Sequence, residues 1–344
     1  LDGLALAYES PWGNGRIESP LWGAFNAENL GIALAVLLIE GVPPELLTKA
    51  NTQATATIGE TFSYRIAVPS VPHSAPIYDV RVLDDLGAAA ADLEFIGVNK
   101  ISGPGNWMPQ NTGSATNLVI EDGVNGIDIP AGQQAVMEIT VRLADTATNV
   151  AGLSFTNTAA YSYNLRNGED ATQRPGPPGT TEPMTIVEPD LTMEKSGPLR
   201  ARVGVPDTFT LNVHNAGASP AYSVTLTDLL PNENDGGMCD AAPQNITAQV
   251  FEADGITPVS AVLVEGADFT VTFAGDPICV LTLNMLSSDA TIGVDHRLIV
   301  TYDAQVDAGS LENTALTNVA GATQWFSIDP SDPAGRTYTR TLTD

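Results

Sequence analysis

The sequence TIGETFSYRIAV at residues 57–68 occurs a second time, in altered form, as RVGVPDTFTLNV at residues 202–213. Each copy begins with a glycine turn and then alternates apolar and polar residues. The apolar positions are Phe62, Tyr64, Ile66 and Val68 in the first copy and Phe209, Leu211 and Val213 in the second. An alternation with a period of two residues is typical of a β-strand that buries one face. Both copies are therefore predicted to be core-facing strands.

The similarity continues along the chain. APIYDVRVLDDL at residues 75–86 matches SPAYSVTLTDLL at residues 219–230, and Asn-Thr-Ala occurs at residues 157–159 and again at 313–315. Three matches in the same order indicate an internal repeat of about 145 residues. The sequence therefore predicts three parts: an N-terminal segment over residues 1–49, a first repeat over 50–188 and a second over 189–344.

Composition defines the class of protein. Among 344 residues there are 41 Asp and Glu against 14 Lys and Arg, which gives a formal net charge of −27. Because nucleic-acid affinity comes from cations that neutralise phosphates, a nucleic-acid partner is not expected. The longest apolar run, residues 30–39, is too short to span a membrane. Strand signals separated by Gly and Pro predict an all-β chain with two tandem immunoglobulin-like sandwiches.

The N-terminal segment differs from the repeats. Asn26 is a candidate helix cap, residues 30–39 are rich in Ala and Leu, and Gly41 is a candidate helix end. Pro43 and Pro44 suit the first turn of a second short helix. We therefore expect a short helical segment, whose removal through residue 48 leaves both sandwiches folded.

Part of this segment resembles a known enzyme family. SPWGNGRIESPL at residues 10–21 and GAFNAENL at residues 23–30 are similar to the end of the central domain of a Mur ligase. The resemblance implies ATP-dependent addition of an amino acid to a peptidoglycan precursor, with Asn26 and Asn29 near the nucleotide. The chain lacks the Gly-x-x-x-x-Gly-Lys-Thr/Ser loop that would bind the phosphates. The segment is therefore interpreted as a remnant or a fusion, and the ligase as an alternative function.

The order of motifs in the repeats resembles the conserved repeat domains of large bacterial surface proteins and the isopeptide-forming domains of fimbrial proteins. The resemblance covers about residues 48–344 and implies a non-enzymatic structural or adhesive module on the bacterial cell surface. Its implied partners are other repeats of a longer parent chain, other surface proteins, or a receptor that the sequence does not identify.

Lysine is scarce, and two of the three lysines occupy matching places. Lys49 and Lys195 precede the glycine turns of the first and second repeats at nearly the same spacing. In the fimbrial domains, this first strand supplies a lysine that bonds to an asparagine on the last strand, assisted by a buried acid. The resemblance implies two such sets, which are Lys49, Asp84 and Asn157 in the first repeat and Lys195, Asp228 and Asn313 in the second.

The chemistry of such a cross-link explains its residue types. A buried lysine loses its proton more readily and becomes a nucleophile. A buried aspartic acid that keeps its proton polarises the asparagine carbonyl. Ammonia then leaves, and an isopeptide bond remains. The alternative is a surface lysine at a domain junction, with the asparagine in an ordinary β-arch hydrogen bond.

Other functions find less support in the sequence. His73, His214 and His296 have no nucleophile motif near them and no metal-ligand spacing, so no enzyme activity is predicted. Acidic turns at residues 232–237 and 329–332 leave a calcium-dependent adhesin or glycan-binding module as a further alternative. No other cofactor is expected.

Cys239 and Cys279 are the only cysteines, and both fall in the second repeat. A disulfide and two buried thiols are the alternatives, and an exported chain favours the disulfide.

Overall fold

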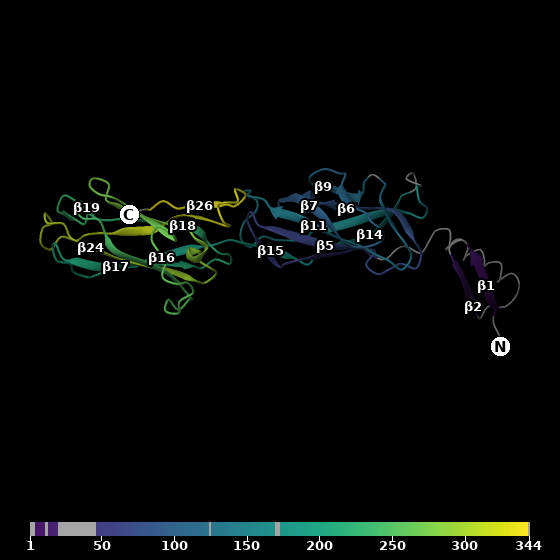
Figure 1. Cartoon of the computed structure of the whole chain (residues 1–344), viewed down its shortest axis with the longest axis horizontal. Helices are drawn as coiled ribbons and strands as arrows, with labels where there is room; N and C mark the ends of the chain where they lie inside the picture. The colour runs from purple at the N-terminus through teal and green to yellow at the C-terminus, as the bar shows by residue number, and fades with distance from the viewer. Residues whose placement is uncertain (1–3, 11–12, 20–45, 124, 169–172, 343–344) are drawn as a thin grey trace. The chain divides into compact units, whose positions relative to one another are not determined.

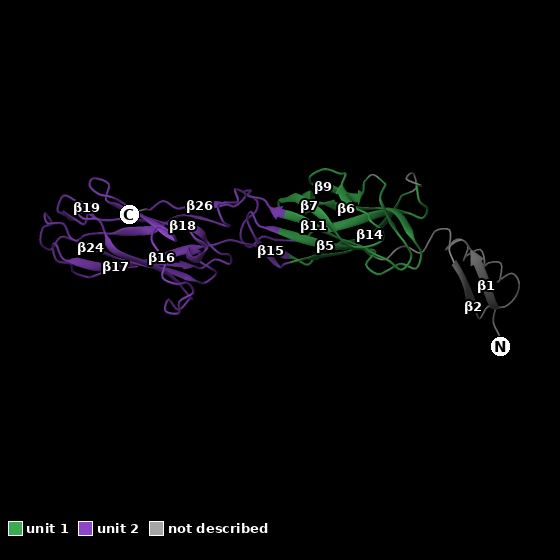
Figure 2. Cartoon of the chain, viewed as in Figure 1, with its two compact units in different colours: residues 1–52, 62–141, 156–183 green, residues 53–61, 142–155, 184–344 purple. Residues whose placement is uncertain are grey.

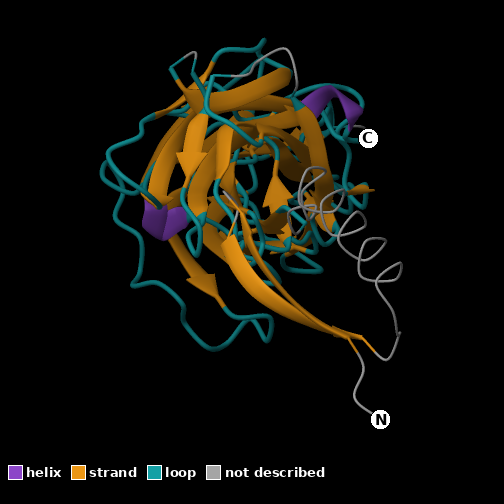
Figure 3. Ribbon diagram, turned by 90° about the vertical axis from the view of Figure 1, so that its right-hand side faces the viewer, coloured by secondary structure: helices purple, strands orange, loops and turns teal. Residues whose placement is uncertain are grey.

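The computed structural model describes residues 4–10, 13–19, 46–123, 125–168 and 173–342. Regular structure in this part of the chain consists of β-strands and short 3₁₀ turns, as Figure 3 shows. The all-β class predicted from the sequence is confirmed. The expected N-terminal helices and the nucleotide-site residues Asn26 and Asn29 lie outside the described residues. Over that same described part, no helix has the length and apolar character needed to cross a bilayer.

The chain forms two compact units (Figure 2). Unit 1 contains residues 1–52, 62–141 and 156–183, and unit 2 contains residues 53–61, 142–155 and 184–344. The end of the predicted first repeat therefore clusters with the second unit. The N-terminal strands β1 (Leu4–Ser10) and β2 (Gly13–Ser19) form an antiparallel pair.

Besides the β1–β2 pair, the described part of unit 1 contains two larger sheets, and Figure 1 labels several of their strands (β5, β6, β7, β9, β11 and β14). One has the order β3-β5-β11-β7, with β3 (Thr48–Asn51), β5 (Thr61–Val68), β11 (Ala135–Leu143) and β7 (Leu93–Ser102). The other has the order β14-β13-β6-β9-β8, with β14 (Arg174–Thr180), β13 (Thr158–Asn164), β6 (Ile77–Asp85), β9 (Asn117–Asp122) and β8 (Pro109–Asn111), and β10 (Ile127–Ile129) also pairs with β6.

Unit 2 repeats this arrangement. One sheet has the order β16-β17-β24-β21, with β16 (Leu191–Ser196), β17 (Pro206–Asn215), β24 (Arg297–Gln305) and β21 (Gln244–Phe251). The other has the order β22-β23-β18-β25-β26, with β22 (Phe269–Ala274), β23 (Val280–Met285), β18 (Tyr222–Leu229), β25 (Val319–Phe326) and β26 (Thr337–Thr339).

Unit 2 also holds two small sheets. One has the order β12-β15-β4, with β12 (Ser154–Phe155), β15 (Met184–Val187) and β4 (Thr55–Thr57). The other pairs β19 (Asn232–Glu233) with β20 (Gly236–Gly237).

The alternation seen in the sequence forms the core. Along β11 and β24 every second side chain is buried. The core of unit 2 combines both large sheets, with Leu211 and Val213 from β17 against Leu226 from β18 and Leu283 from β23. Burying one face of each sheet against the other removes apolar surface from water, and this is the main favourable contribution to folding.

The glycine turns before β5 and β17 have the same geometry. Gly59 has φ 86° and Gly204 has φ 71°, a backbone region that side chains other than glycine rarely adopt. The N–H of Gly59 donates to Leu143 O at 2.8 Å, and the N–H of Gly204 donates to Val306 O at 2.9 Å. The shared turn therefore pairs the start of each strand with the end of its neighbour.

Two stretches expected to be loops contain strands. Residues 97–117 include much of β7 and all of β8, and residues 166–183 include β14. β14 lies at a sheet edge, where proline is tolerated because one side of the strand needs no N–H donor. A Cβ on Gly176 would lie 2.2 Å from the ring of Tyr161, so this glycine is required by close packing. The Gly/Pro-rich composition therefore reflects an edge strand.

The disulfide between Cys239 and Cys279 closes 40 residues of unit 2. Cys239 immediately follows Met238 in a buried turn, and Cys279 precedes β23. The bond therefore joins two loops of one sandwich.

We expect the Cys239→Ser/Cys279→Ser variant to lose about 4 kcal/mol of unfolding free energy, because the unfolded chain regains the entropy of an open loop. Urea denaturation of oxidised wild type and variant measures this difference. Thiol titration of denatured, unreduced wild-type protein is the control, and two free thiols would contradict the disulfide.

Residues 46–47 already belong to unit 1. Leu47 is 2% exposed and its N–H donates to Pro177 O at 3.2 Å, while the N–H of Ser70 donates to Leu46 O at 2.6 Å. We therefore expect a chain lacking residues 1–45 to unfold at the temperature of the full chain. A chain lacking residues 1–48 should lose about 3 kcal/mol, the usual cost of removing a buried leucine. Calorimetric melting tests both, and equal melting of the two shortened chains would contradict the role of Leu47.

Candidate functional site

A buried ion pair crosses the core of the first repeat. Lys49 lies on β3, opposite Ile66 of β5, and Asp84 lies near the end of β6. The Nζ of Lys49 donates to Asp84 Oδ2 at 2.5 Å, and both side chains are 0% exposed. The same Nζ lies 4.3 Å from the ring centre of Tyr64. The two charges therefore meet in the space between the sheets.

Asn157 lies beside this pair. It comes just before β13, on which Ala159 is paired with Asp84. Asn157 is 2% exposed, and neither its Nδ2 nor its Oδ1 has a hydrogen-bond partner. Burial raises the pKa of Tyr64, the charge of Asp84 raises that pKa further, and the nearby Asn157 side chain lowers it. Tyr64 therefore has both Asp84 and Asn157 as neighbours.

The second repeat has the corresponding pair. Lys195 lies on β16, opposite Leu211 of β17. Its Nζ donates to Asp228 Oδ1 at 2.6 Å and to Asp228 Oδ2 at 2.5 Å, and the side chain of Asp228 is 0% exposed. The hydroxyl of Tyr302 on β24 donates to Asp228 Oδ2 at 2.6 Å and accepts from Lys195 Nζ at 2.9 Å.

In the second repeat the asparagine with the strand register of Asn157 is Asn318, and the predicted Asn313 lies elsewhere. Asn313 is exposed in a turn with φ 65°. Asn318 comes just before β25, on which Ala320 is paired with Asp228, so it has the register that Asn157 has in the first repeat. Its Nδ2 donates to the Tyr302 hydroxyl at 3.4 Å. The Asn-Thr-Ala match is therefore misleading in the second repeat, because five further residues separate the motif from the aligned strand.

Each site contains a buried tyrosine that the sequence analysis did not assign. Sequence spacing alone could not find Tyr302, because its strand is far from both Lys195 and Asp228 in the chain. For Tyr64 the alternation of its strand was a usable signal. Tyr64 lies two positions from Ile66, the residue opposite Lys49, so the side chains of Tyr64 and Lys49 lie on the same face of the sheet.

Burial changes the acidity of both lysines. Desolvation lowers the pKa of Lys49 and of Lys195 from 10.5 to about 8, although the neighbouring aspartates raise it. A lysine with a lowered pKa supplies a neutral amine more readily, and the amine is the nucleophilic form. Each site therefore combines an activated amine, a carboxylate that can take its proton, and a carboxamide.

The other candidate sites show no comparable geometry. Within the described ranges, no group of three or more His, Cys, Asp or Glu side chains is placed to hold a metal ion. In the acidic turn at residues 329–332, Asp329 Oδ1 accepts from the N–H of Ser331, and Asp332 Oδ1 accepts from the N–H of Ala334. These carboxylates stabilise a turn, and the calcium-binding alternative stays a prediction.

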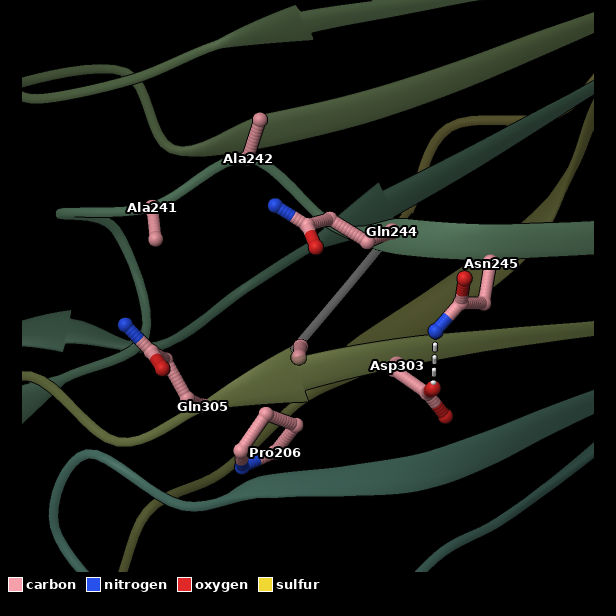
Figure 4. Close-up of a pocket in the computed structure, with 8 residues that line it drawn as sticks. Pro206, Ala241, Ala242, Gln244, Asn245, Asp303 and Gln305 are labelled. Atoms are coloured by element: carbon pink, nitrogen blue, oxygen red, sulfur yellow. Dashed lines mark hydrogen bonds between the residues drawn. The ribbon is translucent and has the colours of Figure 1, made fainter.

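A shallow hollow of about 90 Å³ lies in unit 2 (Figure 4). It is lined by Pro206, Ala241, Ala242, Gln244, Asn245, Asp303, Ala304 and Gln305. Asn245 donates to Asp303 Oδ2 at 2.8 Å across it. The carboxylate of Asp303, the charged group of this hollow, is thus already hydrogen-bonded to Asn245. A hollow of this volume would hold only a few atoms of a ligand.

No family model matches the chain. The UDP-N-acetylmuramoyl-L-alanyl-D-glutamate–2,6-diaminopimelate ligases of two Neisseria meningitidis strains, of serogroups A and B, are 43% identical to it over 42 residues. The match covers 12% of this chain, and the chain spans 8% of the length of these curated relatives.

Several bacterial surface proteins are among the similar solved structures. The C-terminal domain of the Streptococcus agalactiae AgI/II polypeptide BspA has a TM-score of 0.38 and 10% identity, covering 87% of this chain and 99% of its own. The collagen adhesin CNA from S. aureus has a TM-score of 0.27 and 10% identity, covering 88% and 93%. Similarity at this level carries no argument about function.

The lowered pKa of the lysines predicts a pH dependence of stability in an Asn157→Ala/Asn318→Ala chain, where no cross-link can form. Between pH 8 and 10.5 the unfolded chain holds lysine protons that the folded chain has released, so the unfolding free energy rises with pH. The upper limit is about 1.4 kcal/mol per pH unit for each lysine.

Urea denaturation between about pH 7.5 and pH 9.5 measures this slope. The matched control is the same chain with Lys49→Met and Lys195→Met, which keeps the other titrating groups. A stability difference between the two chains that does not change with pH would contradict the lowered lysine pKa.

Proposed function

We propose that this chain is a non-enzymatic structural or adhesive module of a bacterial cell-surface protein. Its two immunoglobulin-like sandwiches are each closed by an isopeptide bond, from Lys49 to Asn157 in the first repeat and from Lys195 to Asn318 in the second. The observation that carries the proposal is the presence in both repeats of a lysine paired with a buried aspartate, and of a carboxamide in the same strand register; the lysine side chain is 0% exposed in the first repeat and 14% exposed in the second.

The reaction balances without a cofactor. The lysine ammonium first gives a proton to the aspartate. The neutral amine then attacks Cγ of the asparagine, and a C–N bond forms. The bond from Cγ to the amide nitrogen breaks, and that nitrogen leaves as ammonia after gaining a second lysine proton. The third lysine proton stays on the new amide, and no oxidant or reductant is involved.

The unpaired polar atoms of the first repeat support this reaction. Asn157 Nδ2 and Oδ1, Asp84 Oδ1 and the hydroxyl of Tyr64 are buried without hydrogen-bond partners. Each such atom costs about 1–3 kcal/mol when it is left unsatisfied. A cross-link removes the Nδ2 as ammonia and discharges the lysine, so it relieves two of the costs that the unreacted site carries.

The position of the bonds suits a module that transmits force. Lys49 lies on the first strand of its sandwich and Asn157 stands at the start of a late strand, 108 residues further on (157 minus 49). Closing a loop of this length removes about 4.7 kcal/mol of unfolded-chain entropy, by the same argument that applies to disulfides. Because the covalent path bypasses the strands between these residues, tension would not extend the segment from Lys49 to Asn157.

Intact-mass measurement of the purified chain tests the proposal. The wild type is expected to be lighter than its sequence by two molecules of ammonia, beyond the loss of hydrogen at the disulfide. Lys195→Ala and Asn318→Ala should each restore one ammonia. An unmodified wild-type mass would end the proposal.

Asn313→Ala is the matched control for Asn318→Ala, because both remove one carboxamide from the same segment of the chain. The Asn313→Ala chain should still lose two molecules of ammonia. Retention of one ammonia in this variant, and not in Asn318→Ala, would return the assignment to Asn313.

A further inference from the structure

The two repeats supply the tyrosine hydroxyl of the site from different strands. In the first repeat Glu60 is hydrogen-bonded to Leu143 and Ser63 contacts Thr140, and this antiparallel register places Ile139 of β11 opposite Tyr64 of β5. In the second repeat the corresponding pair is Phe209 of β17 and Tyr302 of β24. Each pair thus contains one tyrosine hydroxyl, which comes from β5 in the first repeat and from β24 in the second.

The rings occupy equivalent places beside the lysine. Lys49 Nζ lies 4.3 Å from the ring centre of Tyr64, and Lys195 Nζ lies 5.6 Å from that of Phe209 and 5.5 Å from that of Tyr302. Packing against the lysine therefore accounts for an aromatic ring on β5 or β17. It does not account for the hydroxyl, which is buried and present in both repeats.

The hydroxyl of Tyr302 contacts both nitrogens that change partners in the proposed reaction. It accepts from Lys195 Nζ, the attacking atom, at 2.9 Å, and from Asn318 Nδ2, the leaving atom, at 3.4 Å. Its own proton is donated to Asp228 Oδ2 at 2.6 Å. In the first repeat the Tyr64 hydroxyl is buried without a hydrogen-bond partner and has Asn157 as its neighbour.

We infer that Tyr302, and Tyr64 in the first repeat, are catalytic residues of the cross-linking reaction that carry a proton from the attacking nitrogen to the leaving nitrogen. This inference rests on the proposed function. After the amine has attacked, the lysine nitrogen carries one proton too many and the departing nitrogen one too few. The phenol gives its proton to the departing nitrogen and takes one from the lysine nitrogen, so it ends the step unchanged.

The phenol suits this role because it stays protonated. Burial and the charge of Asp228 both raise the pKa of Tyr302, so the hydroxyl keeps a proton to give. Water has little access to this space, since Lys49, Asp84 and Asp228 have side chains with no exposed surface and the side chain of Lys195 is 14% exposed.

The test follows cross-linking in the full chain during cell-free synthesis, by intact mass and by mass mapping of the linked peptides. Tyr302→Phe keeps the ring and removes only the oxygen. We expect it to slow the second-repeat reaction by on the order of 10²-fold or more, the usual contribution of a positioned proton donor. The first-repeat bond of the same molecule forms at the wild-type rate and serves as the internal control.

Rescue separates a proton carrier from a packing role. Phe209→Tyr combined with Tyr302→Phe moves the hydroxyl to the strand that carries it in the first repeat, and it should restore at least a tenfold faster reaction. Tyr64→Phe is the independent second variant, and it should slow only the first-repeat bond. Wild-type rates in both Tyr→Phe variants would overturn the inference while leaving the proposed function intact. If neither repeat of the wild type loses ammonia, the proposed function itself fails.

Discussion

The structure of both repeats depends on a lysine–aspartate pair held between two sheets. Removing two charges from water costs several kcal/mol for each ion, and their attraction repays this only with good geometry. Each sandwich nevertheless keeps the pair, and the side chains of Asp84 and Asp228 have no exposed surface. Both repeats therefore carry this cost at the same place in the fold.

The period-two alternation predicted the core strands, because one buried face dictates the spacing of apolar residues. The grouping of Lys49 with Asp84 came from the resemblance to fimbrial domains, and the structure places the two residues on strands of different sheets. The Asn-Thr-Ala match assigned Asn313, and the strand register assigns Asn318. Because Asn313 lies in a turn before β25, its motif does not fix which residue is paired with Asp228. Five additional residues before the strand therefore place Asn318, and not the asparagine of the motif, in the register of Asn157.

The tyrosines show a second limit of sequence comparison. Tyr64 aligns with Phe209, and Tyr302 corresponds to Ile139, so neither position of a repeat alignment keeps the hydroxyl. The two repeats share the position of the hydroxyl beside the lysine and the aspartate, and the tyrosine that supplies it lies on either of two neighbouring strands. Edge strands were missed for a related reason: the Gly and Pro residues of β14 are compatible with a loop, and only the close approach of Tyr161 to Gly176 shows why they stand in a strand.

Lysine scarcity has a practical consequence. Lys100 donates to Gly105 O at 2.6 Å near the surface of unit 1, whereas the other two lysine nitrogens lie in the sandwich interiors. Once those two are acylated, Lys100 carries the remaining ε-amine of the chain. Amine-reactive dyes or surfaces would then react with a single lysine side chain and with the terminal α-amine, and a lysine-specific endoprotease would have one cleavage point. The protein would thus offer a defined handle for immobilisation without an engineered cysteine, and its own disulfide would remain untouched.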